Sequence, residues 1–133
     1  MRDLRRLLFL ALAVVMLSGG SAWAHHSFAM FDLEKEVTLE GVVKEFPWKN
    51  PHVWLHILTP DGKGGTTEWG LEMGTTGMLT RTGWKRSMLK EGDKVTVVLN
   101  PLKDGAPNGR LVRVTLPNGS VMGPGGAPPP PKS

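Results

Sequence analysis

The chain has 133 residues, no cysteine, and 16 basic against 12 acidic residues, which gives it a formal net charge of +4. The length fits one domain, and the lack of cysteine excludes a disulfide framework and a lipid carried on cysteine. The basic residues do not form the stripe that follows a nucleic-acid backbone, so the composition argues against nucleic acid as a partner.

Residues 1–24 have the pattern of a secretory signal peptide. Three arginines precede an apolar run, Leu7–Leu17, and the segment Ala22-Trp23-Ala24 carries small residues at the positions that signal peptidase reads. The apolar run is shorter than the about 20 residues that a membrane-spanning helix needs. We therefore expect cleavage after Ala24, a periplasmic protein that begins with His25, and no membrane anchor after cleavage.

The mature sequence predicts a short arm, one domain and a tail. Residues 25–34 form the expected N-terminal arm, and residues 35–118 alternate apolar and polar side chains in five segments separated by turn residues. Residues 119–133 are rich in proline and glycine, so we expect a disordered tail there. The five expected strands are Val37–Phe46, Val53–Leu58, Thr66–Met73, Lys94–Leu99 and Arg110–Leu116.

The third and fourth expected strands are separated by Thr75–Leu89, where apolar residues with helical spacing are interrupted by Gly77 and Gly83. This pattern indicates short helical turns rather than one long helix. Gly41, inside the first expected strand, indicates a bulge or a sharp bend. An all-β chain with three strands, a short helix and two strands is typical of a five-stranded OB-fold-like Greek-key barrel. The alternative is a small β-sandwich.

Two motifs carry a resemblance to a known family. The first is His25-His26-Ser27-Phe28-Ala29-Met30-Phe31-Asp32 at the expected mature start, and the second is Asn50-Pro51-His52. With further matches such as Arg81-Thr82-Gly83-Trp84, they cover nearly all of residues 25–118. The chain thereby resembles an uncharacterised family of small exported bacterial proteins, a domain of unknown function. The resemblance implies a single periplasmic domain and no established activity.

All four histidines lie in two clusters, at residues 25–26 and 52–56. After cleavage, His25 would offer its amine and its imidazole on one residue, a chelate that suits Cu(II), and another histidine would add a third nitrogen. His52 and His56 lie on an expected strand, about 13 Å apart at 3.3 Å per residue, so each would meet the arm separately. We therefore expect copper, or another transition metal, to bind through His25, His26, His52 and His56. The alternative is a polar sheet face without a metal.

The second and third expected strands are predicted to form a hairpin across the loop of residues 59–66. A register in which partner numbers sum to 124 gives the inner pairs Val53–Leu71 and Leu55–Trp69. The same register gives the outer pairs His56–Glu68, Trp54–Gly70 and His52–Glu72. Cross-strand histidine–glutamate pairs beside a tryptophan make the outer face a candidate surface for a ligand or a partner. Its expected members are Trp48, His52, Trp54, His56, Glu68 and Glu72.

Two functions remain open from the sequence. The first is a periplasmic, non-enzymatic binding protein that holds copper or another transition metal through His25. The second is an interaction or small-ligand module that uses the face of the second and third strands to bind a periplasmic protein or a small ligand. The chain has no recognisable nucleophile motif. Glu68 and Glu72 would be about 13 Å apart on a strand, too far for a glycosidase pair, so no catalytic residue is predicted.

Overall fold

The computed structural model describes residues 28–127. The chain divides into two compact units, residues 1–30 and residues 31–133, and the first unit lies almost entirely outside the described residues. The expected signal peptide, its cleavage site, His25 and His26 therefore lie outside them too, and the fold given below is that of the second unit. Within residues 28–127, no helix is long and apolar enough to cross a membrane.

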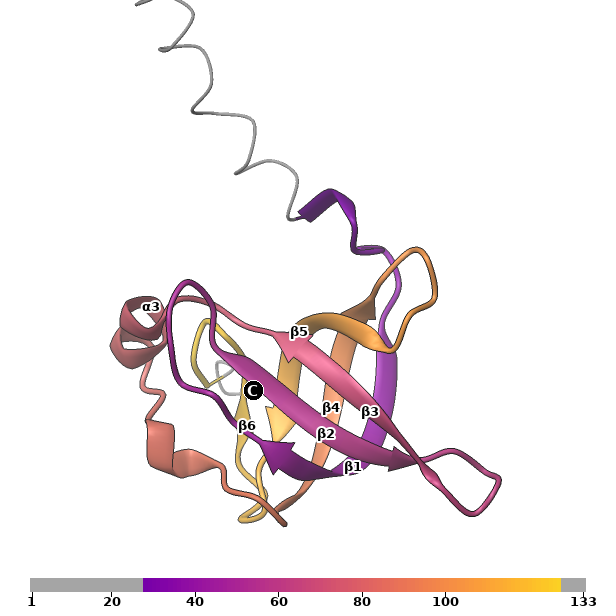
Figure 1. Cartoon of the computed structure of the whole chain (residues 1–133). Helices are drawn as coiled ribbons and strands as arrows, with labels where there is room; N and C mark the ends of the chain where they lie inside the picture. The colour runs from indigo at the N-terminus through magenta and orange to yellow at the C-terminus, as the bar shows by residue number, and fades with distance from the viewer. Residues whose placement is uncertain (1–27, 128–133) are drawn as a thin grey trace, which may run out of the picture. The chain divides into compact units, whose positions relative to one another are not determined.

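Six strands form one mostly antiparallel sheet (Figure 1). In spatial order they are β3 (Thr66–Glu72), β2 (Trp54–Pro60), β1 (Val37–Glu45), β4 (Lys94–Pro101), β5 (Asn108–Thr115) and β6 (Val121–Met122). A further, parallel pairing between β3 and β5 closes the first five into a ring of hydrogen-bonded strands. The fold is therefore mostly β, as the alternating segments predict, and each of the five expected strands overlaps an observed one.

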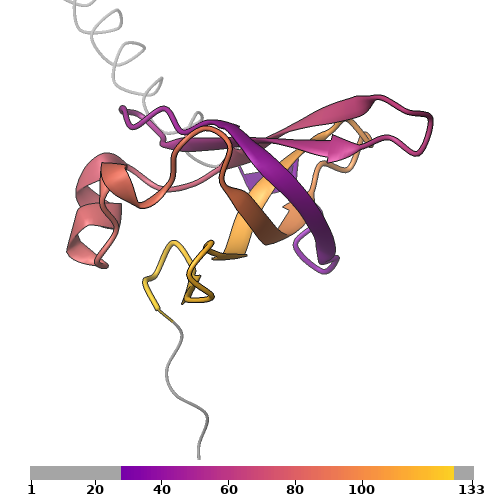
Figure 2. The ribbon, with the colours of Figure 1, turned by 90° about the horizontal axis from the view of Figure 1, so that it is seen from below.

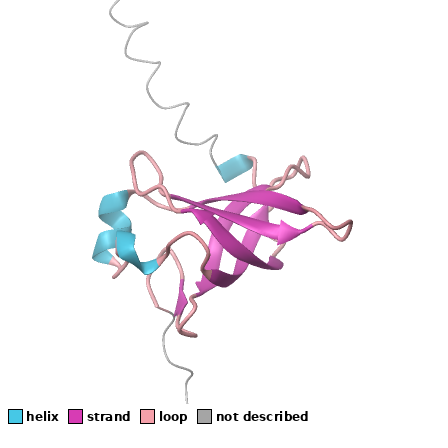
Figure 3. Cartoon of the chain, turned by 60° about the horizontal axis from the view of Figure 1, so that its bottom comes forward, coloured by secondary structure: helices cyan, strands magenta, loops and turns pink. Residues whose placement is uncertain are grey.

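Two short helical segments join β3 to β4 at one end of the sheet (Figure 3). They are α3 (Thr76–Arg81) and the 3₁₀ helix η1 (Arg86–Met88), and they lie where the glycine-interrupted pattern predicts helical turns. The Thr75 hydroxyl accepts a hydrogen bond from the Met78 amide and caps the start of α3. The side-chain oxygen of Asn50 accepts bonds from the amide and the hydroxyl of Thr76. The Asn50-Pro51-His52 motif is thereby tied to the same helix.

The core lies on the inner face of the ring, because the strands alternate buried and exposed side chains. In β2, Leu55 and Ile57 are fully buried, while His56 is half-buried on the outer face. Trp69, expected inside, is half-buried and packs against the core, and Trp84 is its largest fully buried side chain. The buried core residues are Val43, Val53, Leu55, Ile57, Leu71, Met73, Leu79, Trp84, Leu89, Val95, Val97, Leu99, Leu111, Val114, Leu116 and Met122.

The β2–β3 hairpin, which extends beyond the rest of the sheet (Figure 2), pairs two residues away from the expected register. His56 lies opposite Gly70 rather than Glu68, so the predicted register is wrong. The reason is the loop: Asp61 accepts hydrogen bonds from the amides of Lys63 and Gly65, which centres the turn one residue later. A shift of two keeps every side chain on its expected face. The inner and outer faces of the hairpin are therefore those that the sequence predicts.

Strand β1 carries a β-bulge near its end, beyond the position that Gly41 indicates. Val43 keeps the regular register with β2, but Glu45 lies opposite His56, so Lys44 is an extra residue in β1. An extra residue moves the side chains that follow it to the other face of the strand. Lys44 and Glu45 therefore both reach the outer face, where strict alternation would place only Lys44.

The fold includes residues on both sides of the expected domain limits, 35 and 118. Phe31, assigned to the arm by its sequence, is buried and forms a bridge with Leu102. In the expected tail, β6 pairs with β5, and the buried ring of Trp84 donates from Nε1 to the carbonyl oxygen of Gly123 at 2.7 Å. The segment that follows β6 is thus bound to the connection between α3 and η1. Residues 128–133 lie outside the described residues.

Candidate metal centre

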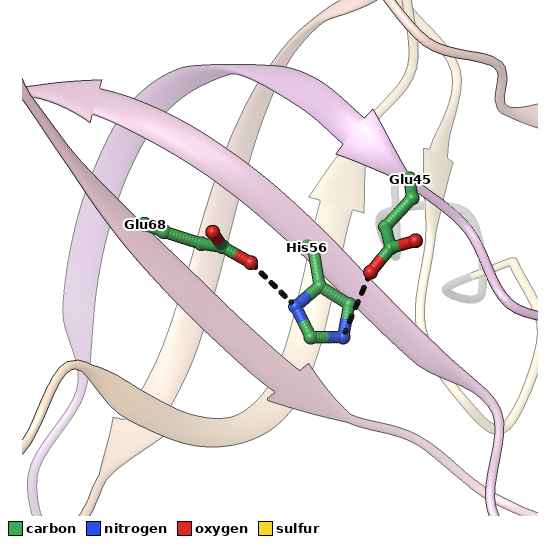
Figure 4. Close-up of side chains that lie close together, drawn as sticks. All are labelled: Glu45, His56 and Glu68. Carbon is green, nitrogen blue, oxygen red and sulfur yellow. Dashed lines mark hydrogen bonds and ion pairs between the residues drawn. The ribbon is translucent and has the colours of Figure 1, made fainter.

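His56 lies on the outer face of β2 between two carboxylates (Figure 4). Its Nδ1 atom is 3.1 Å from Oε1 of Glu68 on β3, and its Nε2 atom is 3.9 Å from Oε1 of Glu45 at the end of β1. A quarter of the His56 side chain (25 %) is exposed, and both carboxylates are more exposed than the ring. One ring nitrogen is thus hydrogen-bonded, and the other faces a carboxylate that is too distant for a hydrogen bond.

The three side chains converge because of the hairpin register and the bulge. Glu68 lies two residues from Gly70, the partner of His56, and so reaches His56 as a diagonal neighbour across β2 and β3. Glu45 approaches from the opposite side, because the bulge at Lys44 turns it to the outer face. Each member of the group therefore comes from a different strand.

Lys44 places a positive charge beside this group. Its Nζ atom donates to Oε2 of Glu68 at 2.5 Å, while Oε1 of the same carboxylate faces His56. The hydrogen bond from Lys44 is the main reason that the pKa of Glu68 lies below its ordinary value, and His56 contributes less. The same bond raises the pKa of Lys44. Glu68 is therefore ionised at neutral pH, and its oxygens only accept hydrogen bonds.

A second histidine–glutamate pair lies on the same face. Nδ1 of His52 is 2.9 Å from Oε1 of Glu72. Trp54 lies between the two histidines in the sequence, and its ring centroid is 6.1 Å from that of His56. Trp48, which belongs to the expected surface, packs instead against the core and makes an edge contact with the ring of Phe46 at 5.7 Å.

Glu45, His56 and Glu68 have the chemistry of a metal site. Each offers one donor atom, and the three atoms lie within 4.8 Å of one another. Imidazole nitrogen and carboxylate oxygen bind Zn(II), Cu(II) and related ions at about 2.0–2.2 Å, which puts the donors of one tetrahedral ion about 3.4 Å apart. A closing movement of at most about 1.4 Å would bring the widest pair to that separation. Within residues 28–127, no other group of three such donors lies this close together.

The sequence predicts part of this group and misses the rest. His56 meets Glu68 and His52 meets Glu72, as the outer-face pairs predict, although both contacts are diagonal. Glu45 is missed, because strict alternation puts it on the inner face. The sequence feature that could have revealed the bulge is the succession Lys44-Glu45, because two adjacent charged residues cannot both lie on the outer face of a regular strand. The proposed participation of the undescribed His25 and His26 stays a prediction.

Comparison with known proteins gives a family and no activity. No curated protein and no solved structure gives a significant match to the chain. A family model matches residues 13–111 of the 133, and its description is a family of unknown function, DUF6152. The matched range includes Glu45, His56 and Glu68, and it agrees with the resemblance carried by the two histidine-containing motifs. The chain therefore belongs to the family of unknown function DUF6152.

Proposed function

We propose that the protein is an exported, non-enzymatic binding protein that holds one divalent transition-metal ion on the outer face of β1, β2 and β3. The observation that supports this proposal is the convergence of Glu45, His56 and Glu68 from three different strands, with potential donor atoms that lie within 4.8 Å of one another. The carboxylates of Glu45 and Glu68, with the ammonium of Lys44 beside them, have a net negative charge, which attracts cations.

Copper is the first metal to test. The group offers nitrogen and oxygen but no sulfur, a donor set that suits Cu(II) and Zn(II) better than Cu(I). If export exposes His25 as the amino terminus, its amine and imidazole would themselves offer a nitrogen chelate for Cu(II). Intact-mass analysis of protein from the periplasm tests this arrangement, since a chain that keeps residues 1–24 has no terminal histidine.

The test of the metal site is a titration of the mature protein with Cu(II) and with Zn(II), followed by calorimetry. His56→Ala removes the central donor, so we expect its affinity for the first ion to fall at least tenfold. His52→Ala is the matched control: the sequence predicts His52 among the metal ligands, but it has its own glutamate partner and is not one of the three converging residues, so we expect no change. Equal affinities of His56→Ala and the parent protein would contradict the proposal.

The terminal histidine is tested by a variant with one extra residue ahead of His25. The extra residue separates the free amine from the imidazole and leaves every side chain in place. Copper binding should weaken if the amine is a ligand, while zinc binding that depends on His56 should persist. Identical copper titrations of the extended and the native protein would show that the terminus is not a ligand.

A second candidate function is partner or small-ligand binding by the same face. The observation that favours it is Trp54, whose half-buried ring lies beside His56 on the outer face of β2. Tryptophans that are partly exposed beside charged groups are common anchors of binding surfaces. Trp54→Ala should abolish such binding, whereas removal of His25 should leave it unchanged and should weaken only copper binding.

The closed ring supports a finer description of the fold, an OB-fold-like Greek-key barrel. Around the ring the strands follow the order β1-β2-β3-β5-β4, with α3 between β3 and β4. A β-sandwich would instead divide the strands between two packed sheets. Barrels of this kind commonly bind ligands on the face of their second and third strands, and β2 and β3 supply His56 and Glu68 to the proposed site.

A further inference from the structure

We infer that the two sides of His56 have different roles: Nε2 of His56 and a carboxylate oxygen of Glu45 bind the metal ion, while Glu68 is a positioning residue that holds the imidazole through Nδ1. This inference rests on the proposed metal-binding function. It adds that Lys44 takes part indirectly, by fixing the carboxylate of Glu68.

The contact between His56 and Glu68 determines which ring nitrogen is available. Nδ1 lies 3.1 Å from Oε1 of Glu68, which is hydrogen-bond distance. An ionised carboxylate only accepts hydrogen bonds, so the hydrogen must be on Nδ1. A neutral imidazole with its hydrogen on Nδ1 carries its lone pair on Nε2. The lone pair that a metal needs is therefore on Nε2, the ring nitrogen that lies 3.9 Å from Oε1 of Glu45.

The space between His56 and Glu45 has the size of a bridging ion. Nε2 and Oε1 of Glu45 are 3.9 Å apart, too far for a hydrogen bond. If an ion lay about 2.1 Å from both atoms, the angle at the ion between Nε2 and Oε1 would be about 140°. Glu45 is the most exposed of the three side chains, at 57 %, so it has room to close the angle toward the tetrahedral value.

Glu68, in contrast, is held in place. Its Oε2 atom accepts from Lys44 and its Oε1 atom accepts from His56, so both oxygens already have partners. If Glu68 moved to the metal, it would lose these contacts. A carboxylate that accepts from the second nitrogen of a metal-bound histidine fixes the orientation of the ring, and its loss typically weakens metal binding 10- to 100-fold. Lys44 and Glu68 thus form the support of the site rather than its ligand set.

The experiment is NMR spectroscopy of the full mature protein labelled with ¹⁵N in histidine, without metal and with Zn(II). In the zinc-free protein, we expect the neutral ring of His56 to carry its hydrogen on Nδ1. Zinc should shift the ¹⁵N resonance of Nε2. Glu68→Ala should lose the preference for the Nδ1–H tautomer and bind zinc at least tenfold more weakly. Glu72→Ala, which removes the partner of His52 instead, is the matched control and should change neither result.

The outcomes separate this inference from the proposed function. If zinc binds through His56 but shifts Nδ1, or if Glu68→Ala keeps the tautomer, the assignment of roles is overturned while the metal site stands. If Glu45→Ala binds zinc as well as the parent protein does, Glu45 is not a ligand and the assignment also fails. If zinc does not bind at all, the proposed function fails, and the assignment of roles fails with it. If zinc binds tightly to Nε2, and Glu45→Ala and Glu68→Ala each weaken this binding, the result supports the proposed function and the assignment of roles.

Discussion

At the scale of single residues, the ion pair between Glu68 and Lys44 has a role that its contribution to folding stability does not explain. Its bond to Lys44 is an exposed ion pair, and such pairs contribute little to the free energy of folding because water screens them. The same bond fixes the direction in which the other carboxylate oxygen points, toward Nδ1 of His56. The effect of Lys44 is therefore mainly on geometry and protonation, and a titration should show it more clearly than thermal unfolding does.

The carboxyl group of Glu68 should titrate below its ordinary pKa of 4.5, because the hydrogen bond from Lys44 favours the ionised form. Lys44→Met should raise that pKa toward the ordinary value, and Lys63→Met, in the hairpin loop, should leave it unchanged. Carboxyl ¹³C NMR across the acid range measures the shift. Since the pKa is lowered by folding, the pair stabilises the fold above the ordinary pKa and loses this effect as the pH falls through the lowered pKa. An unchanged pKa in Lys44→Met would exclude Lys44 as the cause.

At the scale of strands and helices, the sequence is most informative where apolar and polar residues alternate over several positions. The alternation of β2 determines which side chains are buried, and this part of the prediction is confirmed. The register of the hairpin depends on the side chain of Asp61 in the loop, which alternation does not describe. β6 has only two residues, Val121–Met122, too few to show a period. Local patterns therefore predict the faces, while the contacts that join elements decide register and ends.

Gly109 shows how tightly the ring is closed. It lies in β5 between Pro101 of β4 and Leu71 of β3, and a Cβ atom built on it would lie 2.6 Å from the backbone oxygen of Asn100. A backbone oxygen moves only if its strand moves, so Gly109→Ala should destabilise the protein by about 1–3 kcal/mol. Chemical denaturation measures this change.

The matched control is Gly77→Ala in α3. A Cβ atom there has its nearest neighbour, a side-chain nitrogen of Arg81, at 3.7 Å, which is ordinary contact. Alanine favours the helix, so this variant should be more stable by about 0.5–1 kcal/mol. If Gly109→Ala were as well tolerated as Gly77→Ala, β4 and β5 would not approach each other as closely as the structure indicates.

At the scale of the whole chain, the segment after β5 belongs to the fold. Trp84 is buried, and its Nε1–H donates to the carbonyl oxygen of Gly123, while the hydroxyl of Thr82 donates to the carbonyl oxygen of Pro124. Met122 contributes a buried side chain to the core. The glycine- and proline-rich composition of this segment hides these contacts, because two of them are made by backbone carbonyls, which every residue type has.

A chain that ends at Asn118 should therefore be less stable than the full mature protein by about 2–4 kcal/mol, since it leaves the indole N–H of Trp84 without its acceptor and exposes core surface. The control ends at Ala127 and removes only residues 128–133. We expect its denaturation midpoint to equal that of the mature protein. Denaturation followed by tryptophan fluorescence compares the three chains, and equal stability of the shortest one would show that β6 and the segment after it are dispensable.

The bulge at Lys44 has a consequence for other members of the family. Glu45 faces His56 only because β1 contains one residue more than its partner strand at this point. A relative in which the same Lys-Glu succession forms a regular strand, without the bulge, would direct that glutamate into the core and would have no such group. Residue identity at aligned positions is therefore not sufficient to recognise the centre. How the first strand pairs with the second at this point must be known as well.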